Sequence, residues 1–589
     1  MKKMATSRKV PSVIAVLCLG LIAAVEGRYS SGLCDEGDSN VLLEFKAEFS
    51  DEAGQLETWK EGTSCCSWDG VNCNFNGRVR GLRLLNRNHL EAPSMIAIPN
   101  ASTAAGASLG RLVALNYLIA EGVYFNGPIP SSWGSLQLLT HLNLVDPNFT
   151  GSIPPEIGNM RELRNLQLDG GELEGSLPWE ICKLANLTVL QIIGNKLTGG
   201  LPPCMGNLTG IQEISFGSNF LGSNIPSWIG NLVHLTKLTL SDNLFSGPIP
   251  PSIGRLTDLK QLLLSDNMLS GSIPQEIGNM TEITDLAVEN NYLSGRIPSA
   301  LANCKSLRFL GLHDNELSGF IPKELGFLPQ LTLLQLFNNN LYGPLPAELG
   351  SIPEENNLSI DVSNNSLSGP IPDTLSSIGA LYAANNYFTG GFPLSLAAKA
   401  FSVDLSNNRL SSVWQVGAMP ENPQLHQLSL GSNRLTGQIP TWLSSLVNLG
   451  TLDLSNNELK GGITPSLLAL KSLTSLNISS NPLHADLPTW SPNFTGNIGS
   501  LDLQGALLTG PLPAKFLDGF PNLFHLDLSD NFLVGELPSN IGDRVSLTYL
   551  DLSSNKFWGL VPAAIHNLSQ LSYLDLSNNY FMGPVPSKP

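Results

Sequence analysis

Apolar and polar residues recur along this chain in one repeated consensus pattern, LxxLxLxxNxLxGxIP. A clear copy begins at Leu235 and reads LTKLTLSDNLFSGPIP. With the asparagine of each copy as a marker, the series Asn195, Asn219, Asn243 and Asn267 advances by a constant 24 residues. A fixed period of this length indicates a repeat protein, in which each unit packs only on its neighbours.

The marker can be followed over most of the chain. The step of 24 extends forwards to Asn339 and backwards to Gly171, Pro147 and Val123, where other residues replace asparagine. Beyond Asn339 the steps vary from 21 to 26, as far as Asn579. These positions define about twenty repeats.

Each residue type in the line predicts a local structure. The alternating leucines, as at Leu452 and Leu454, have the period of a short strand with one buried face. The side-chain amide of the marker asparagine can satisfy backbone groups of the following turn, so stacked repeats should form an asparagine ladder. A glycine, as at Gly247, permits a tight bend, and the Ile-Pro that follows begins an extended or helical return segment. One repeat is therefore predicted to be one coil of a solenoid.

The start of the chain has the pattern of a secretory signal peptide. Basic residues from Lys2 to Lys9 precede an apolar stretch from Val10 to Val25, followed by the small residue Gly27. This stretch is short of the roughly 20 apolar residues that a spanning helix needs. We therefore predict an exported chain that loses residues 1–27.

Composition and charge narrow the class of protein. The chain is 42 % hydrophobic and 14 % charged, which fits a folded core and argues against a disordered or coiled-coil chain. Its 49 acidic and 32 basic residues give a net charge of −17. Nucleic acid is therefore not expected as a partner, nor is an anionic membrane surface.

The cysteines point to an oxidising compartment. Four of them crowd into a short N-terminal block: Cys34, Cys65, Cys66 and Cys73. A zinc site is the alternative, but the block has no paired CxxC motif and no nearby histidine. Cys182, Cys204 and Cys304 lie within repeats. Cys182 and Cys204 can pair across neighbouring coils, although buried thiols are the interpretation we favour.

The repeat line, together with the block DSNVLLEFKAEF from Asp38 and the segment CCSWDGVNC from Cys65, resembles the plant-type subfamily of leucine-rich-repeat proteins. That family includes receptor-like proteins, receptor-kinase ectodomains and polygalacturonase-inhibiting proteins. The resemblance implies an α/β repeat solenoid, a leucine-rich-repeat superhelix with a concave parallel sheet and an N-terminal disulfide cap. It also implies the pairs Cys34 with Cys65 and Cys66 with Cys73.

These observations divide the chain into three parts. Residues 1–27 are the signal peptide, residues 28–78 the N-terminal cap, and residues 79–589 about 20–21 leucine-rich repeats of period 24. Within the cap, Val41, Leu42, Phe45 and Phe49 have helical spacing and should cover the exposed end of the first coil.

The sequence does not predict an enzyme. Asp502, Asp527, Asp551 and Asp575 form a column on adjacent strands, an arrangement that suggests a retaining glycosidase. However, Asp-Leu-Ser is the consensus sequence of the repeat at these positions, and no two of the carboxylates stand out from the others as a catalytic pair. The histidines are scattered without an HExxH motif, and no phosphate loop or dinucleotide fingerprint precedes a helix. We therefore expect no catalytic residues, no cofactor and no metal site.

The concave face instead predicts ligand binding. Its exposed strand positions lie two, four and six residues before each marker, and in the C-terminal repeats they read as a monotonous column of Asp and Ser. In the second to tenth repeats other residues replace this default, and exposed aromatic and mixed-charge residues on a rigid scaffold are typical of a protein-binding surface. The predicted ligand-binding residues are Tyr117, His141, Gln167, Asp169, Gln191, Glu213, Lys237, Glu289, Phe309, His313, Gln335, Phe337 and Tyr382.

Ten sequons predict N-glycosylation in the secretory route. Asn477 occupies a concave strand position, so a glycan there would obstruct the C-terminal half of the face. The sequons are Asn100, Asn148, Asn186, Asn207, Asn279, Asn357, Asn364, Asn477, Asn493 and Asn567.

The resemblance implies extracellular recognition of a protein or peptide ligand, in signalling or defence, as a receptor-like ectodomain with a co-receptor kinase as a candidate second partner. A secreted inhibitor of microbial cell-wall hydrolases is the first alternative. A structural or ice-binding solenoid is the second, and the irregular return segments disfavour it. The expected location is the cell wall or extracellular space, or the outer face of the plasma membrane if the chain continues past Pro589 into a membrane helix.

Overall fold

The computed structural model describes residues 33–51, 54–85, 95–97, 105–411, 423–488 and 495–584. The predicted signal peptide and the sequons Asn100 and Asn493 lie outside these residues. The chain divides into two compact units, Met1–Lys196 and Leu197–Pro589. No helix of the described residues is long and apolar enough to cross a membrane.

The first unit begins with the predicted cap. Helix α2 (Glu36–Ala47) buries Val41, Leu42 and Phe45 and packs against the 3-10 helix η3 (Ala107–Arg111) of the first coil. The amphipathic pattern is thereby confirmed for these three residues, whose apolar side covers core that the first coil would otherwise expose to water. The fourth predicted residue, Phe49, is buried but lies beyond the helix, on the short strand β1 (Phe49–Ser50).

The cap is held by an ion pair and two disulfides. The Arg78 guanidinium donates twice to the buried Asp38 carboxylate, at 2.9 Å each, and the backbone N–H of Val79 donates to it at 2.7 Å. The two predicted disulfides are confirmed, with Cα atoms 5.4 and 5.5 Å apart: Cys34–Cys65 and Cys66–Cys73.

The prediction for the cysteines of the repeats was partly wrong. Cys182 and Cys204 are both disulfide-bonded, whereas buried thiols were favoured. Cys304 is a free and fully buried thiol, as predicted. Burial raises the pKa of the Cys304 thiol to about 11.

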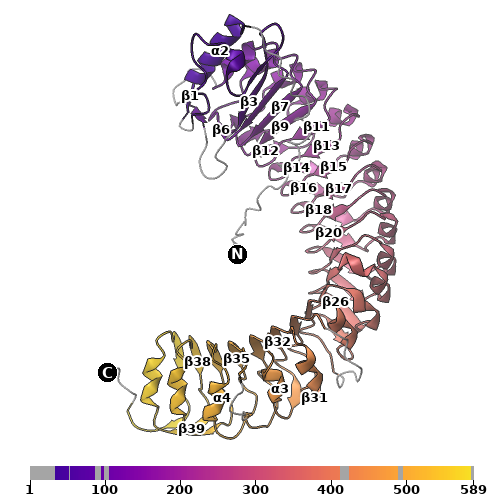
Figure 1. Cartoon of the computed structure of the whole chain (residues 1–589). Coiled ribbons are helices and arrows are strands. Elements are labelled where there is room, and N and C mark those ends of the chain that lie inside the picture. The colour runs from indigo at the N-terminus through magenta and orange to yellow at the C-terminus, as the bar shows by residue number, and fades with distance from the viewer. Residues whose placement is uncertain are drawn as a thin grey trace. The chain divides into compact units, whose positions relative to one another are not determined.

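Within each unit, successive repeats contribute one strand each to a main sheet, and neighbouring repeat strands pair in parallel, as predicted (Figure 1). The register advances by one repeat per strand, so that Lys237 of β15 lies beside Gln261 of β17. In the first unit the main strands are β2 (Val71–Cys73, antiparallel to β3), β3 (Val79–Leu85), β5 (Tyr117–Glu121), β7 (His141–Val145), β9 (Asn165–Asp169) and β11 (Val189–Gln191). In the second unit they are β13 (Glu213–Ser215), β15 (Lys237–Thr239), β17 (Gln261–Leu263), β19 (Asp285–Ala287), β21 (Phe309–Gly311), β23 (Leu333–Gln335), β25 (Ser359–Asp361), β27 (Ala380–Tyr382), β29 (Ser402–Asp404), β30 (Gln427–Ser429), β32 (Thr451–Asp453), β34 (Ser475–Asn477), β35 (Ser500–Asp502), β36 (His525–Asp527), β38 (Tyr549–Asp551) and β40 (Tyr573–Asp575).

A second set of short strands was not predicted. Most follow the marker position of a repeat, in the segment for which only a bend was expected, and pair in parallel with neighbouring coils. The exception is β1 of the cap, which pairs antiparallel with β4. In the first unit these strands are β1 (Phe49–Ser50), β4 (Met95–Ala97), β6 (Val123–Tyr124), β8 (Thr150–Gly151) and β10 (Glu172–Gly175). In the rest of the chain they are β12 (Lys196–Gly199), β14 (Phe220–Asn224), β16 (Leu244–Gly247), β18 (Met268–Ser272), β20 (Tyr292–Gly295), β22 (Glu316–Gly319), β24 (Asn340–Gly343), β26 (Ser366–Pro370), β28 (Tyr387–Thr389), β31 (Thr436–Gln438), β33 (Glu458–Lys460), β37 (Val534–Gly535), β39 (Lys556–Gly559) and β41 (Tyr580–Phe581).

The return segments close each coil with a short helix. Most are 3-10 helices of five residues, from η4 (Ser131–Ser135) to η19 (Ala563–Asn567), and two are short α-helices, α3 (Pro465–Leu468) and α4 (Ala514–Asp518). Gly278 lies at one such turn, where a Cβ atom would come within 2.4 Å of the Ala300 carbonyl oxygen of the next coil. Glycine is thus what allows the return segments to stack closely.

The core runs through the middle of each coil. In the coil that contains β15, Leu238, Leu240, Phe245 and Ile253 are all fully buried. Each coil is open on two sides until its neighbours stack on it, so the core is continuous within a unit.

The asparagine ladder is confirmed. In its own coil, Nδ2 of Asn267 donates to the carbonyls of Leu264 and Ser265 at 3.2 and 3.0 Å. In the preceding coil it donates to the carbonyl of Leu240 at 3.0 Å, while its Oδ1 accepts the N–H of Phe245 at 2.9 Å. One side chain therefore satisfies four buried backbone groups and ties two coils together.

Candidate functional site

The side chains two, four and six residues before each marker asparagine point away from the core. In β15, for example, Leu238 is buried, whereas Lys237 and Thr239 are half-buried. We call the surface that these positions form the open face. All the residues predicted to bind ligand lie on it, and each is half-buried: Tyr117, His141, Gln167, Asp169, Gln191, Glu213, Lys237, Glu289, Phe309, His313, Gln335, Phe337 and Tyr382.

In the first unit, three of these residues bind one another. Nε2 of Gln167 donates to Asp169 Oδ2 at 2.6 Å, and Nε2 of Gln191 donates to the same oxygen. The other oxygen accepts the N–H of Ile193 at 2.8 Å. Burial nevertheless raises the pKa of Asp169. This carboxylate is thus satisfied from within the protein.

The other two predicted residues of the first unit also have local partners. Nδ1 of His141 lies 2.9 Å from Thr140 Oγ1, and burial lowers the pKa of His141, with a smaller effect from Arg164. The ring of Tyr117 lies over Gly81, where a Cβ atom would come within 2.0 Å of Tyr117 Cζ.

In the second unit, Glu213 and Lys237 form an ion pair on neighbouring strands. Their carboxylate oxygen and ammonium nitrogen are 2.7 Å apart, and the side chains are 22 % and 17 % exposed. The Ser215 hydroxyl donates to the same carboxylate at 3.1 Å. These two predicted residues therefore neutralise each other.

Further along this unit, the open face carries a group of aromatic rings. The rings of His313 and Phe337 stack with centroids 4.1 Å apart and planes 10° from parallel. Nδ1 of His313 lies 2.8 Å from Asp314 Oδ2, which fixes the imidazole in place. We call Phe309, His313 and Phe337 the aromatic cluster.

Gly311 makes a low point within this cluster. A Cβ atom there would come within 2.8 Å of Phe309 Cζ and within 2.6 Å of Glu289 Oε2, so both side chains lie over the glycine. Gln335 is the strand partner of Gly311 in the next coil. The cluster thus combines aromatic rings, an amide and a carboxylate within three coils.

Two apolar residues of this surface were missed from the sequence. Leu263 and Leu333 occupy open-face positions and are half-buried, and Leu333 is the strand partner of Phe309. Both replace the polar default of the repeat, so the same comparison of positions would have found them. Tyr382, by contrast, is separated from Gln335 by the intervening strand β25.

The C-terminal part of the open face is less monotonous than predicted. The rings of His525, Tyr549 and Tyr573 stack at 4.3 and 4.4 Å across three coils. The prediction was wrong because it weighed only the Asp and Ser columns and omitted the column six residues before the marker. The Tyr573 hydroxyl lies 3.3 Å from Asp551 Oδ2, so these rings cover the carboxylates beneath them.

The Asp column has a structural role. One oxygen of each carboxylate accepts the backbone N–H two residues later, where the main strand has ended, as in Asp453 with Ser455 and Asp551 with Ser553, both at 2.9 Å. Asn477 replaces Asp in one coil and accepts the N–H of Ser479 in the same way at 2.9 Å. Turn formation thus explains the Asp-Leu-Ser default without catalysis.

The described sequons are mostly exposed. Asn148 and Asn477 are half-buried. The exposed asparagines are Asn186, Asn207, Asn279, Asn357, Asn364 and Asn567.

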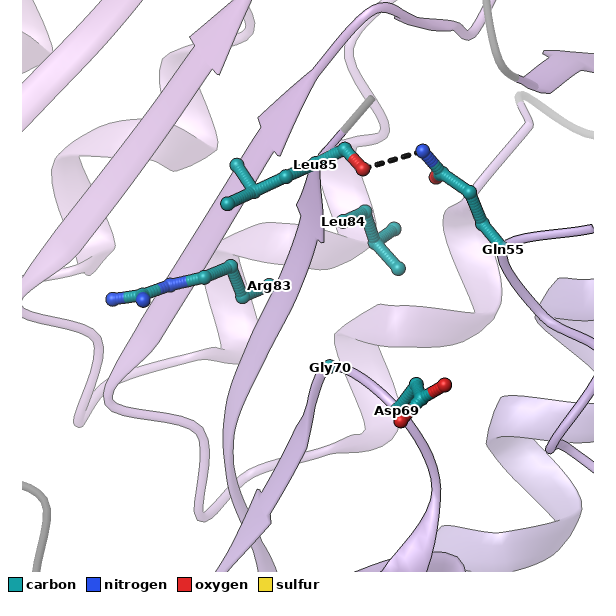
Figure 2. Close-up of a pocket in the computed structure, with 6 residues that line it drawn as sticks. All are labelled: Gln55, Asp69, Gly70, Arg83, Leu84 and Leu85. Carbon is teal, nitrogen blue, oxygen red and sulfur yellow. Dashed lines mark hydrogen bonds between the residues drawn. The ribbon is translucent and has the colours of Figure 1, made fainter. Parts of the chain in front are cut away.

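A pocket lies between the cap and strand β3 (Figure 2). Gln55 donates from Nε2 to the carbonyl of Leu85 at 2.5 Å, and the Gln55 Oε1 atom is buried without a hydrogen bond. Gly70, Asp69 and Arg83 complete much of its lining.

Family models match both the cap and the repeats. A leucine-rich-repeat N-terminal domain matches residues 35–74. Leucine-rich-repeat models match residues 423–483 and 521–581, and residues 186–208, 234–256, 258–280, 306–328 and 358–378.

Solved structures match nearly the whole chain. The plant peptide hormone receptor RGFR1, in complex with RGF2, is 32 % identical with a TM-score of 0.75, over 88 % of this chain and 84 % of that one. The chain belongs to the plant leucine-rich-repeat proteins. This leucine-rich-repeat chain is also similar to PEPR1 in its complex with AtPEP1, at 29 % identity and a TM-score of 0.77, over 94 % of this chain and 80 % of that one. The Arabidopsis receptor kinase HAESA, in complex with the peptide hormone IDA and the co-receptor SERK1, is 28 % identical with a TM-score of 0.65, over 94 % and 95 % of the two chains.

Curated leucine-rich-repeat relatives match over shorter stretches. Receptor-like protein EIX2 of Solanum lycopersicum is 34 % identical over 109 residues, 18 % of this chain and 11 % of that protein. Receptor-like protein 47 of Arabidopsis thaliana is 30 % identical over 129 residues, 21 % of this chain and 15 % of that protein. The matched stretch is thus a small part of each relative's length.

Proposed function

We propose that this protein is an extracellular recognition protein that binds a peptide or protein ligand on its open face, without catalysis. The aromatic cluster carries the proposal. Phe309 and Phe337 are apolar rings held half-exposed on a rigid sheet, and most C-terminal repeats carry serine at the position that corresponds to Phe337. Rings fixed in this way lose little conformational entropy on binding, which is why aromatic residues dominate the energetics of protein interfaces.

The structural relatives support this function. RGFR1, PEPR1 and HAESA are each described in complex with a peptide, and HAESA additionally with the co-receptor SERK1. We extend to this chain a peptide ligand in signalling or defence, with a co-receptor kinase as second partner and the extracellular space or the outer face of the plasma membrane as its location.

The test is capture of peptides from a random dodecapeptide phage library by the full chain. We expect the wild-type protein to enrich peptides whose binding falls by roughly 30-fold or more in the double variant Phe309→Ala, Phe337→Ala, because a buried aromatic anchor contributes about 2 kcal/mol.

The matched control is Phe220→Ala, Tyr292→Ala. These rings are 52 % and 58 % exposed on β14 and β20, outside the open face, and their removal should leave capture unchanged. Peptides that bind wild type and the Phe309, Phe337 variant equally would contradict the assignment of the site.

A further inference from the structure

The Glu289 carboxylate lies inside the aromatic cluster. It belongs to the coil that precedes Phe309, and its side chain reaches over Gly311, where Oε2 would lie 2.6 Å from an added Cβ atom. Phe309 Cζ would lie 2.8 Å from the same point. A charged group and an aromatic edge thus occupy the same low point of the open face.

One oxygen of this carboxylate lacks the side-chain partner that other acids of the open face have. Asp169 accepts hydrogen bonds from two glutamines, and Glu213 is paired with Lys237. Oε2 of Glu289 is buried and accepts no hydrogen bond, and within the described ranges it is the only buried carboxylate oxygen in that condition. Leaving such a group unpaired is costly, so a ligand that supplies the partner gains affinity.

The charges around Glu289 do not supply that partner. Burial, the largest effect, raises the pKa of Glu289. A hydrogen bond from its own backbone and the charge of His313 oppose this shift, and the charge of Asp266 adds to it. The His313 imidazole is itself in contact with Asp314 at 2.8 Å. The local field is therefore suited to an incoming positive charge.

We propose that Glu289 receives a cationic group of the ligand, a basic side chain or a free amino terminus, while Phe309 and Phe337 contact the hydrocarbon part beside it. The inference rests on the proposed function and adds the chemical class of the group recognised. Carboxylates beside aromatic rings suit lysine and arginine, because the charge is paired while the aliphatic stem packs on apolar surface.

The experiment is a parallel selection from the same random dodecapeptide library on wild type and on Glu289→Gln. The amide has the same shape, and the side chain is not part of the core, so the variant should fold. Among peptides that need Phe309 and Phe337, lysine and arginine should be enriched on wild type and not on Glu289→Gln. Glu282→Gln, which alters an exposed carboxylate on a return segment, should keep the enrichment.

Individual peptides then identify the source of the charge. For a peptide selected on wild type, replacing its basic residue by norleucine or citrulline should weaken binding about 10-fold or more, and the same change should have little effect on Glu289→Gln. If the amino terminus is the group, acetylation should have that effect instead.

The dependence on pH gives a second readout. Because the pKa of Glu289 is raised, lowering the pH should protonate it earlier than an exposed glutamate and weaken capture of a cationic peptide. Four other titratable residues face or adjoin this part of the surface: His313, Asp266, Asp285 and Asp314. The pH dependence of capture that persists in Glu289→Gln measures their contribution.

The outcomes separate the two proposals. Peptides that need Phe309 and Phe337 but carry no excess of basic groups, and bind Glu289→Gln as tightly as wild type, would overturn the role of Glu289 alone. The absence of any peptide that depends on Phe309 and Phe337 would overturn the proposed function and this inference with it.

Discussion

The marker asparagine is the residue on which the repeat depends most. The Asn267 amide satisfies three carbonyls and one N–H, two of these groups in the preceding coil. Serine or aspartate cannot both donate twice or more and accept in this position, since each lacks the amide's pair of N–H donors. The sequence alone therefore predicts this role well.

Replacing Asn267 by Ala should destabilise the second unit by about 2–4 kcal/mol, because several buried backbone groups lose their partners together. Chemical denaturation measures the change, and hydrogen exchange at Phe245, whose N–H bonds to Asn267, should accelerate locally. The control is Asn340→Ala, an exposed asparagine that directly follows the marker Asn339. Equal stability of the two variants would contradict the ladder.

The direction of open-face side chains could not be predicted residue by residue. The sequence places Glu289 and Phe309 on the right surface, but their overlap depends on the missing Cβ atom of Gly311, which lies in the same strand as Phe309 and in a different coil from Glu289. Likewise, the saturation of Asp169 by two glutamines arises from rotamers, which a period does not encode. The repeat pattern thus predicts which residues lie on the open face, whereas the packing of their side chains determines which of them form a site.

At the scale of the element, the main strands could be predicted from the sequence, whereas the second set of short strands could not. Leu238 and Leu240 alternate with polar residues, so β15 has a clear period of two. Strand β16, by contrast, ends in Gly247 and pairs with a register offset, in which Leu244 lies beside Gly222. Glycine and short length are weak signals for a strand, so these strands form because they pair with neighbouring coils and not because of their own sequence preference.

The return segments pack through glycine, and this contact can be tested. Gly278→Ala places a Cβ atom 2.4 Å from the Ala300 carbonyl oxygen, so the two coils must separate. We expect a loss of about 1–3 kcal/mol in stability by thermal or chemical denaturation.

Gly210→Ala is the matched control for this prediction. No atom lies within 4 Å of its added Cβ, so the change should be neutral or slightly stabilising. A Gly278 variant as stable as the Gly210 variant would show that the return segments are not closely packed in solution.

At the scale of the whole molecule, the cap and the repeats both contain disulfide-bonded cysteines, which persist in an oxidising environment. The pairs of the cap followed from the family resemblance, whereas the state of Cys182 and Cys204 did not, because a repeat pattern does not show whether a sulfur has a partner within bonding distance.

Alkylation of the secreted, unfolded and unreduced chain should modify Cys304 and no other cysteine of residues 28–589. The other six are oxidised, and Cys304 becomes reactive only after unfolding, because burial raises the pKa of its thiol to about 11. Peptide mapping by mass spectrometry, with a reduced sample as control, checks this. Label on Cys182 or Cys204 before reduction would contradict the assignment.

The central claim is that ligand recognition takes place on the open face around the aromatic cluster. Hydrogen exchange of the full chain, with and without a peptide captured from the library, tests it most directly. We predict that peptide binding slows exchange in β19, β21 and β23, the main strands that span Asp285 to Gln335. Exchange in the second set of short strands, β14, β16, β18 and β20, should be unchanged. Slower exchange confined to the second set of short strands or to the return segments would contradict binding at the aromatic cluster.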